Sequence, residues 1–151
     1  MTSRFAKILG DHISQNPDET RALARSLASE LRIGDLVALQ GDLGAGKTVF
    51  AQGLGEGLHV SPEVPVRSPT FAIFNIHQGP KPMVHADLYR IDDPEEIEAL
   101  GLIDLLEGSV MVIEWAEKGG VFLARPNMIV SLKDHPEDIS TRRIRIEVPN
   151  D

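Results

Sequence analysis

Cysteine is absent from this chain of 151 residues. Its absence excludes a disulfide scaffold, a zinc ribbon, an iron–sulfur site and thiol catalysis, and it agrees with a reducing cytosol. Long apolar runs are also missing: no stretch approaches the roughly 18–20 residues that span a bilayer, and the first residues lack the apolar core and cleavage site of a signal peptide. We therefore expect a cytoplasmic protein that is not attached to a membrane.

The chain also lacks an excess of basic residues: acidic residues outnumber them, and the net charge is −8. A chain that holds a nucleic-acid backbone by itself normally carries a basic face, so this balance argues against tight autonomous binding of DNA or RNA and leaves a basic partner open. The composition, 42% hydrophobic and 25% charged, is that of a globular protein. Without an internal repeat, a low-complexity tract or a linker, we expect one domain over residues 1–151.

The first half of the chain predicts a helix, a strand, a glycine-rich loop and a second helix. Asn16 is suited to cap a helix that has a proline at its first position and an acid three residues after the cap, and the apolar stripe ends near Gly34. Residues 36–39 are read as a strand buried on both faces. The helix after Lys47 contains three glycines at positions 53, 55 and 57, each costing roughly 1 kcal/mol relative to alanine, so we expect it to end early.

The second half predicts a mixed sheet. Prolines at positions 62, 65 and 69 mark residues 60–68 as a loop, and the alternating run at 70–77 can pair with residues 83–89 as an antiparallel hairpin. Further elements are expected at residues 93–106 (helical), 110–113 (a buried strand), 128–132 and 144–148 (final strands). The fold class is therefore α/β, with a mixed, mainly parallel sheet and an antiparallel hairpin.

A phosphate-binding loop is predicted at residues 41–48, which read GDLGAGKT and match the pattern GxxxxGK followed by Ser or Thr between a strand and a helix. Backbone N–H groups of such a loop converge on phosphate oxygens, the lysine reaches the β and γ oxygens, and the hydroxyl ligates Mg²⁺. A tight glycine turn with an incidental lysine is the bland alternative. The expected nucleotide-binding residues are Asp42, Leu43, Gly44, Ala45, Gly46, Lys47, Thr48 and Val49.

A second acid follows the buried strand at 110–113. Glu114 occupies the place of a Walker-B acid, where it would face the Mg²⁺ held by Thr48, although glutamate replaces the usual aspartate. A surface ion pair at the strand end is the alternative. Trp115 is the only tryptophan, and on residue type alone a packing role is the more common one.

Residues 67–70 lie about twenty residues beyond the phosphate loop, where a switch segment would sense the γ-phosphate; a Ser-Pro strand start is the alternative. His85 and Asp87 share one face of the next strand, and Asp87 could orient or deprotonate an attacking water. The other histidines are scattered, so we expect them to be solvated and no metal other than Mg²⁺ to bind. They are His12, His59, His77 and His135.

The base and the reaction are only weakly constrained. Neither NKxD nor DxxG, the usual GTPase signatures, occurs, which favours adenine by default. No arginine-rich lid is present, which counts modestly against a nucleoside-monophosphate kinase. A kinase for a small molecule or a protein, and a nucleotide-gated binding module without meaningful turnover, remain the alternatives to an ATPase.

The motifs taken in order resemble the TsaE (YjeE) family, a family of bacterial P-loop ATPases of tRNA threonylcarbamoyladenosine synthesis. They are GDLGAGKT at 41–48, SPTF at 68–71, HADLYR at 85–90, EALGLIDLL at 98–106 and IEWAE at 113–117. The resemblance runs from about Asn16 to Glu117 and fades beyond, where Ala116 and residues 124–126 depart from the family pattern. Three arginines resemble basic positions of the family's last strand: Arg142, Arg143 and Arg145.

The resemblance implies a three-layer P-loop NTPase-like fold, ATP and Mg²⁺ as ligands, and slow intrinsic hydrolysis. It implies that the partners TsaB and TsaD carry out the modification at tRNA position 37 and hold the tRNA, while the ATP cycle of this chain resets the complex. By motif position, Thr48 and Glu114 would hold Mg²⁺, Asp87 would assist hydrolysis together with Lys47, and Thr70 would sense the γ-phosphate. Trp115 then moves beside the site.

Overall fold

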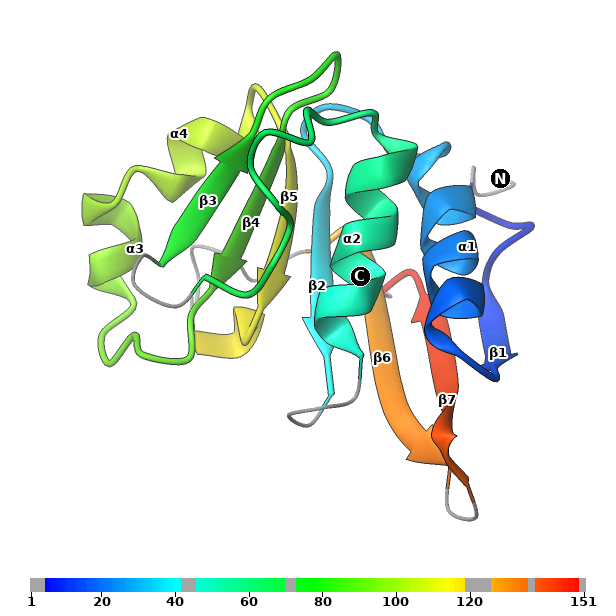
Figure 1. The fold of residues 1–151 in the computed structure, drawn as a ribbon. Coiled ribbons are helices and arrows are strands. Elements are labelled where there is room, and N and C mark those ends of the chain that lie inside the picture. Colours follow the sequence, from blue (N-terminus) through cyan, green and yellow to red (C-terminus); the bar gives the residue numbers. More distant parts are fainter. Residues whose placement is uncertain (1–4, 42–45, 70–72, 119–125, 136–137, 150–151) are drawn as a thin grey trace.

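A computed structural model describes residues 5–41, 46–69, 73–118, 126–135 and 138–149, and seven strands form one sheet in the order β1-β7-β6-β2-β5-β4-β3 (Figure 1). The strands are β1 (Gly10–Ser14), β2 (Leu36–Gln40), β3 (Phe74–His77), β4 (Met83–Asp87), β5 (Val110–Glu114), β6 (Met128–His135) and β7 (Asp138–Glu147). The helices are α1 (Pro17–Ala28), α2 (Lys47–Gly57), α3 (Glu95–Ala99) and α4 (Leu102–Leu106). Within the described ranges, no helix has the length and apolar character needed to cross a membrane.

The predicted mixed sheet is confirmed. Strand β2 lies between β5 and β6 and is parallel to both, and β4 is parallel to β5. Strands β3 and β7 run against their neighbours, so β3 and β4 form the expected hairpin while β1 and β6 flank β7. Five of the seven strands therefore point the same way, and their carboxyl ends lie at one edge of the sheet.

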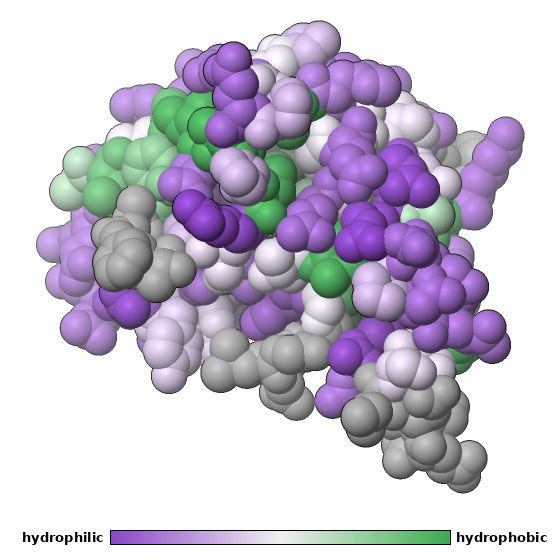
Figure 2. Space-filling view, in the orientation of Figure 1, coloured by the Kyte–Doolittle hydropathy of each residue, from purple (hydrophilic) through white to green (hydrophobic). Residues whose placement is uncertain are grey.

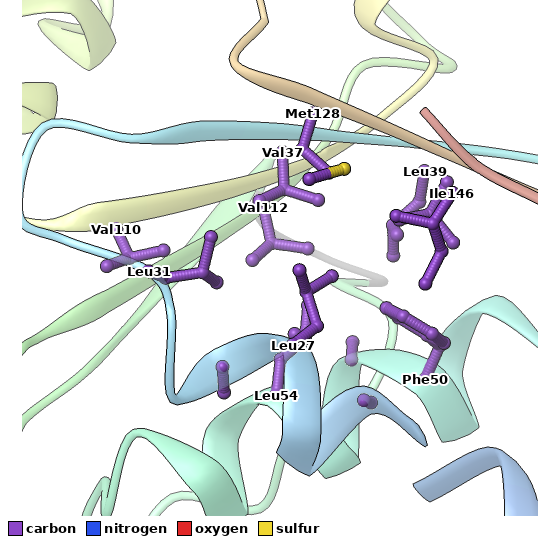
Figure 3. Packing of buried hydrophobic residues seen from close by; sticks show 14 of the residues in the cluster. Leu27, Leu31, Val37, Leu39, Phe50, Leu54, Val110, Val112, Met128 and Ile146 are labelled. Atoms are coloured by element: carbon purple, nitrogen blue, oxygen red, sulfur yellow. The ribbon is translucent and has the colours of Figure 1, made fainter. Parts of the chain in front are cut away.

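Helices cover both faces of the sheet and make three layers (Figure 1). One core joins α1 and α2 to alternate residues of β2, β5 and β6; Figure 3 shows Leu27 and Leu54 of the helices meeting Val37 and Val112 of the sheet. The other core joins α3 and α4 to the opposite face of the sheet, chiefly to side chains of β4 and β5. These are Val84, Ala86, Met111 and Ile113, together with Leu36 of β2. Figure 2 shows that the outer surface on the α1 and α2 side is mostly hydrophilic.

The start of α1 is set locally. The side chain of Asn16 accepts a hydrogen bond of 2.9 Å from the N–H of Glu19, and the Glu19 carboxylate accepts one of 2.8 Å from the N–H of Gln15. The first bond satisfies a donor that the start of a helix leaves unpaired. The second resembles the reciprocal bond of a capping box but goes to the residue before the cap. The helix ends at Ala28, six residues before the expected Gly34, and Leu31 continues the buried stripe after the helix.

The prediction that α2 ends early was wrong, since the helix continues through its glycines to Gly57. A Cβ at Gly53 would lie 2.5 Å from the backbone oxygen of Arg21 and 2.6 Å from the Cβ of Ala24, and one at Gly57 would lie 2.6 Å from the Cβ of Ala28. The glycines thus allow α1 and α2 to approach closely. Tertiary packing of the two helices outweighs the low helix propensity of glycine.

Several boundaries also differ from the sequence expectation. Strand β1 was not predicted; it is a short edge strand that pairs with β7. Strand β3 begins at Phe74, and residues 70–72 of the strand expected at 70–77 lie outside the described residues. Strands β6 and β7 are longer than expected because they pair with each other over most of their length as an antiparallel ribbon.

Candidate functional site

The sequence-predicted residues meet at the carboxyl edge of the parallel strands. Glu114 ends β5 and is in register with Leu39 of β2 on one side and with Asp87 of β4 on the other. Helix α2 begins at Lys47 beside this edge, and Gly46 before it has a φ of 94°, a conformation that favours glycine. Predicted residues 42–45 of the phosphate loop, Asp42, Leu43, Gly44 and Ala45, lie outside the described residues.

Lys47 and Glu114 form a buried ion pair. The Lys47 Nζ lies 3.7 Å from Glu114 Oε1, and the two residues are 7% and 4% exposed. The structure therefore brings together the predicted phosphate-loop lysine and Walker-B acid, and Glu114 is not a surface ion pair. Charged groups are seldom buried to this extent unless they are paired, and such pairs are common at functional sites.

His85 is a third member of this cluster that the sequence did not predict. Its Nε2 lies 2.9 Å from Glu114 Oε2, and the residue is fully buried. The available signal was the position of His85 two residues before Asp87, which places both on the face of β4 that adjoins Glu114. That pattern places His85 on this face, but it cannot show which atom of a neighbouring strand the ring reaches.

The expectation of solvated histidines was wrong for His77, which is fully buried in β3. Its Nδ1 lies 3.2 Å from the carbonyl oxygen of Val64, to which it donates a hydrogen bond. Burial, followed by the nearby His85, lowers the pKa of His77 below the ordinary value of 6.5, against the opposing effect of the bond to Val64. His59 is exposed, His12 is partly exposed, and the side chain of His135 lies outside the described residues.

Asp87 contacts the loop that precedes β3. Its Oδ1 accepts a hydrogen bond of 2.9 Å from the N–H of Tyr89, and its Oδ2 accepts one of 3.5 Å from the hydroxyl of Ser68. From α2, the side chain of Gln52 donates to the carbonyl oxygen of Val66 at 3.1 Å. The predicted switch segment, residues 67–70, is thus bonded through Ser68 to the predicted water-orienting acid, and the residue just before it, Val66, is bonded to the helix that follows the phosphate loop. Thr70 lies outside the described residues.

Trp115 lies beside the buried pair in an unusual backbone conformation. Its φ is +60°, which is rare for a bulky residue and is associated with functional sites. The Lys47 Nζ lies 5.5 Å from its ring centroid, and the Tyr89 ring centroid lies 5.1 Å away. Lys118 donates a hydrogen bond to the carbonyl oxygen of Tyr89 and lies over both rings. Trp115 is half-buried and also packs against the core under α3 and α4, so it lies between that core and the buried pair.

These residues fit a magnesium nucleotide. The N-cap of α2 is Gly46, which makes no side-chain cap hydrogen bond, and the first turn of the helix contains Thr48 and Val49. The first N–H groups of a helix have no partner within the helix. Such N–H groups and the positive end of the helix dipole suit phosphate oxygens. The Thr48 hydroxyl and the Glu114 carboxylate are the hard oxygen donors that Mg²⁺ prefers. Among the described residues, no group of three or more His, Asp or Glu could hold another metal.

A hollow of about 900 Å³ begins at Gln40 and Gly41 and extends over β6, β7 and β1. Cations and carboxylates both line it, and Arg145 is paired there with Asp11 at 3.4 Å and Glu147 at 3.3 Å. Arg142 is paired with Asp134 at 3.4 Å. Two of the three arginines of the last strand therefore make ion pairs within the sheet.

The family of this chain follows from a comparison of its sequence with family models. The model of the threonylcarbamoyl adenosine biosynthesis protein TsaE matches residues 14–144. The chain belongs to the TsaE family. The match confirms the resemblance drawn from the five motifs and extends past Glu117, where the sequence likeness was expected to fade, into β7.

Several TsaE proteins are similar to this chain over much of its length. The tRNA threonylcarbamoyladenosine biosynthesis protein TsaE of Streptomyces coelicolor is 51% identical over 102 residues, which cover 64% of this chain and 67% of that protein. The proteins of the same name from Bacillus subtilis and Rickettsia prowazekii are 45% and 38% identical, over 67% and 81% of this chain. These two matches cover 63% of the Bacillus protein and 85% of the Rickettsia protein.

The fold also agrees with a solved structure. The crystal structure of YdiB from Bacillus subtilis superposes with a TM-score of 0.72 at 31% identity, covering 93% of this chain and 86% of that one. The P-loop-like three-layer fold expected for a TsaE protein is therefore confirmed, and tRNA threonylcarbamoyladenosine biosynthesis is the pathway to which the family belongs.

Proposed function

We propose that this TsaE chain binds ATP and Mg²⁺ at the carboxyl edge of its sheet and hydrolyses the nucleotide slowly. The observation that carries the proposal is the buried pair of Lys47 and Glu114, in which a phosphate-loop lysine at the start of α2 meets an acid at the end of β5. At this place the lysine can bind the negatively charged phosphate, and the glutamate can bind the positively charged metal.

In this proposal the chain's own groups divide the work. Lys47 and the N–H groups at the start of α2 bind phosphate oxygens, while Thr48 and Glu114 hold the metal. When bound, Mg²⁺ neutralises developing charge on the phosphate oxygens. Asp87, in register with Glu114, orients the attacking water, and Trp115 lies against Lys47 at the boundary of the site.

The partners and the pathway step rest on the family. We propose that the chain acts with TsaB and TsaD, and that its ATP cycle resets their complex between rounds of threonylcarbamoyladenosine formation at tRNA position 37. The net charge of −8 supports indirect contact with tRNA, through the partners. Ser68 bonds to Asp87 and Val66 bonds to Gln52, so the 60–68 loop has two links to the nucleotide site, which suits a segment that reports nucleotide state to a partner.

The fate of a labelled γ-phosphate tests the reaction. Free phosphate, released faster when TsaB and TsaD are added, supports the proposal. Label recovered on a metabolite or a protein would instead show a kinase and contradict it. No release under either condition, together with partner capture that depends on ATP, would show a nucleotide-gated binding module.

Two variants separate hydrolysis from partner recognition. We expect Asp87→Ala to bind ATP and join TsaB and TsaD but to remain in the complex, because the γ-phosphate persists. We expect Thr70→Ala to bind ATP but to recruit the partners equally with ATP and ADP, since only differential contacts shift an equilibrium. Gel filtration with ATP, with ADP and without nucleotide measures both; identical behaviour of the two variants would contradict the division of roles.

A further inference from the structure

The carboxylate of Glu114 has two different neighbours, one for each oxygen. Oε1 lies 3.7 Å from the Lys47 Nζ, and Oε2 lies 2.9 Å from the His85 Nε2. Lys47 belongs to α2 and His85 to the interior of β4, so the two oxygens are directed toward different elements. The lysine is the neighbour expected to turn to phosphate, whereas His85 is fixed in the sheet.

The hydrogen bond determines where the proton on His85 lies. A carboxylate oxygen accepts hydrogen bonds, so we take the His85 Nε2–H as the donor to Glu114 Oε2. The other ring nitrogen, Nδ1, is buried and makes no hydrogen bond within the described residues. Proteins often orient the acidic and histidine ligands of a metal by hydrogen bonds to buried residues behind them. The bond from the buried His85 ring to the Glu114 carboxylate is of this kind.

We propose that His85 is a positioning residue for Glu114: it holds Oε2 and leaves Oε1 as the oxygen that faces the ion. This inference deepens the proposed function and rests on it. His85 acts through Glu114 and does not itself touch nucleotide or metal. Without the bond, the carboxylate could rotate about its terminal torsion, which has a shallow energy profile in glutamate. Either oxygen could then face the ion, and the ligand would be less well oriented.

A second buried histidine provides a matched control. His77 lies on the adjacent strand β3, is fully buried and also has one ring nitrogen, Nε2, without a hydrogen bond among the described residues. Its bond goes to the backbone oxygen of Val64 and not to Glu114. Replacing His77 therefore removes a buried imidazole from the same region while leaving the carboxylate held.

The test is the Mg²⁺ concentration that gives half-maximal tightening of ATP binding, measured with a fluorescent ATP analogue. We expect His85→Leu to raise this concentration by about 10- to 100-fold, the usual effect of losing a residue that orients a metal ligand. His85→Gln should stay close to wild type, because a glutamine amide N–H can reach the position of Nε2. His77→Leu should also stay close to wild type, and ATP binding without Mg²⁺ should be similar in all four proteins.

The outcomes separate this inference from the function on which it rests. If Glu114→Gln raises the Mg²⁺ requirement but His85→Leu does not, the positioning role is wrong and the metal site stands. If Glu114→Gln has no effect, the proposed metal site itself fails. An equal loss in His77→Leu and His85→Leu would show a general packing effect and overturn the inference.

A spectroscopic measurement does not depend on any variant folding. Nitrogen-15 shifts of the histidine rings report which nitrogen carries the hydrogen. In the wild-type protein we expect His85 as the Nε2–H tautomer and His77 as the Nδ1–H tautomer. A His85 ring with its hydrogen on Nδ1 would leave no donor for Glu114 and would contradict the proposal.

Discussion

The two ends of α2 are built in opposite ways. The helix starts beside a buried ion pair, where the Lys47 Nζ and Glu114 Oε1 lie 3.7 Å apart. Its second half packs on α1 through Gly53 and Gly57, where side chains have been removed so that two backbones can approach. The comparison teaches that buried charge gathers at the end where we propose that nucleotide binds, whereas the glycine end stabilises the fold that holds the charges in place.

The glycine end should be the more sensitive to added volume. We expect Gly53→Ala to lower the free energy of unfolding by about 1–3 kcal/mol, because its Cβ would lie 2.5 Å from the Arg21 backbone oxygen, and overpacking of this size outweighs the higher helix propensity of alanine. Urea unfolding measures this loss. Gly108→Ala is the control, since a Cβ there meets nothing within 4 Å. Equal stability of the two variants would contradict the explanation that Gly53 allows the two helices to pack closely.

A smaller effect is expected from the cap of α1, which supports the glycine interface from the other helix. Asn16→Ala removes the acceptor for the N–H of Glu19 and should lower the free energy of unfolding by about 1 kcal/mol. Thermal unfolding at fixed pH measures the change, and Asn16→Asp should recover most of it. A loss as large as that of Gly53→Ala would mean that the cap, and not the close approach of the helices, dominates this region.

The smallest effect concerns pH. The lowered pKa of His77 means that the unfolded chain binds a proton more readily than the folded one, so stability rises with pH in the window below the ordinary value of 6.5 and is unaffected above it. The contribution is at most about 1.4 kcal/mol per pH unit. We expect His77→Leu to reduce the difference between the free energies of unfolding measured at pH 5.5 and at pH 7.5, which lie about one unit below and above the ordinary pKa. If the pH dependence of stability is the same in this variant as in the wild type, it comes from groups other than His77, and the prediction is wrong.

How much the sequence predicted depends on the range of the interaction concerned. The start of α1 is set by Asn16 and its neighbours, and it was predicted and is confirmed. The place of Glu114 at the end of a strand beside the one that leads into the phosphate loop was also predicted, and its register with Leu39 confirms it. Strand β1 was missed because its five residues are mostly exposed and become a strand only through distant β7. The length of α2 was missed because intrinsic propensity says nothing of a neighbouring helix.

The candidate site shows the same limit. The position of His85 was predicted to share a face with Asp87, which the register confirms. Its bond to Glu114 could not be predicted, since it depends on the separation of β4 and β5 and on the direction of a buried ring. The unusual φ of Trp115 likewise arises from the chain's turn after β5 and leaves no signal in the residue type.

The central claim is that the charged end of α2 binds a magnesium nucleotide while the fold depends on the rest of the helix. Thermal unfolding of the wild-type protein and Lys47→Ala, each with and without Mg²⁺ and ATP, tests it most directly. We predict two folded proteins, with nucleotide stabilising only the wild type, by about 2.7 kcal/mol when ATP is at 100 times its dissociation constant. Equal stabilisation of both proteins, or a Lys47→Ala chain that does not fold, would contradict the account.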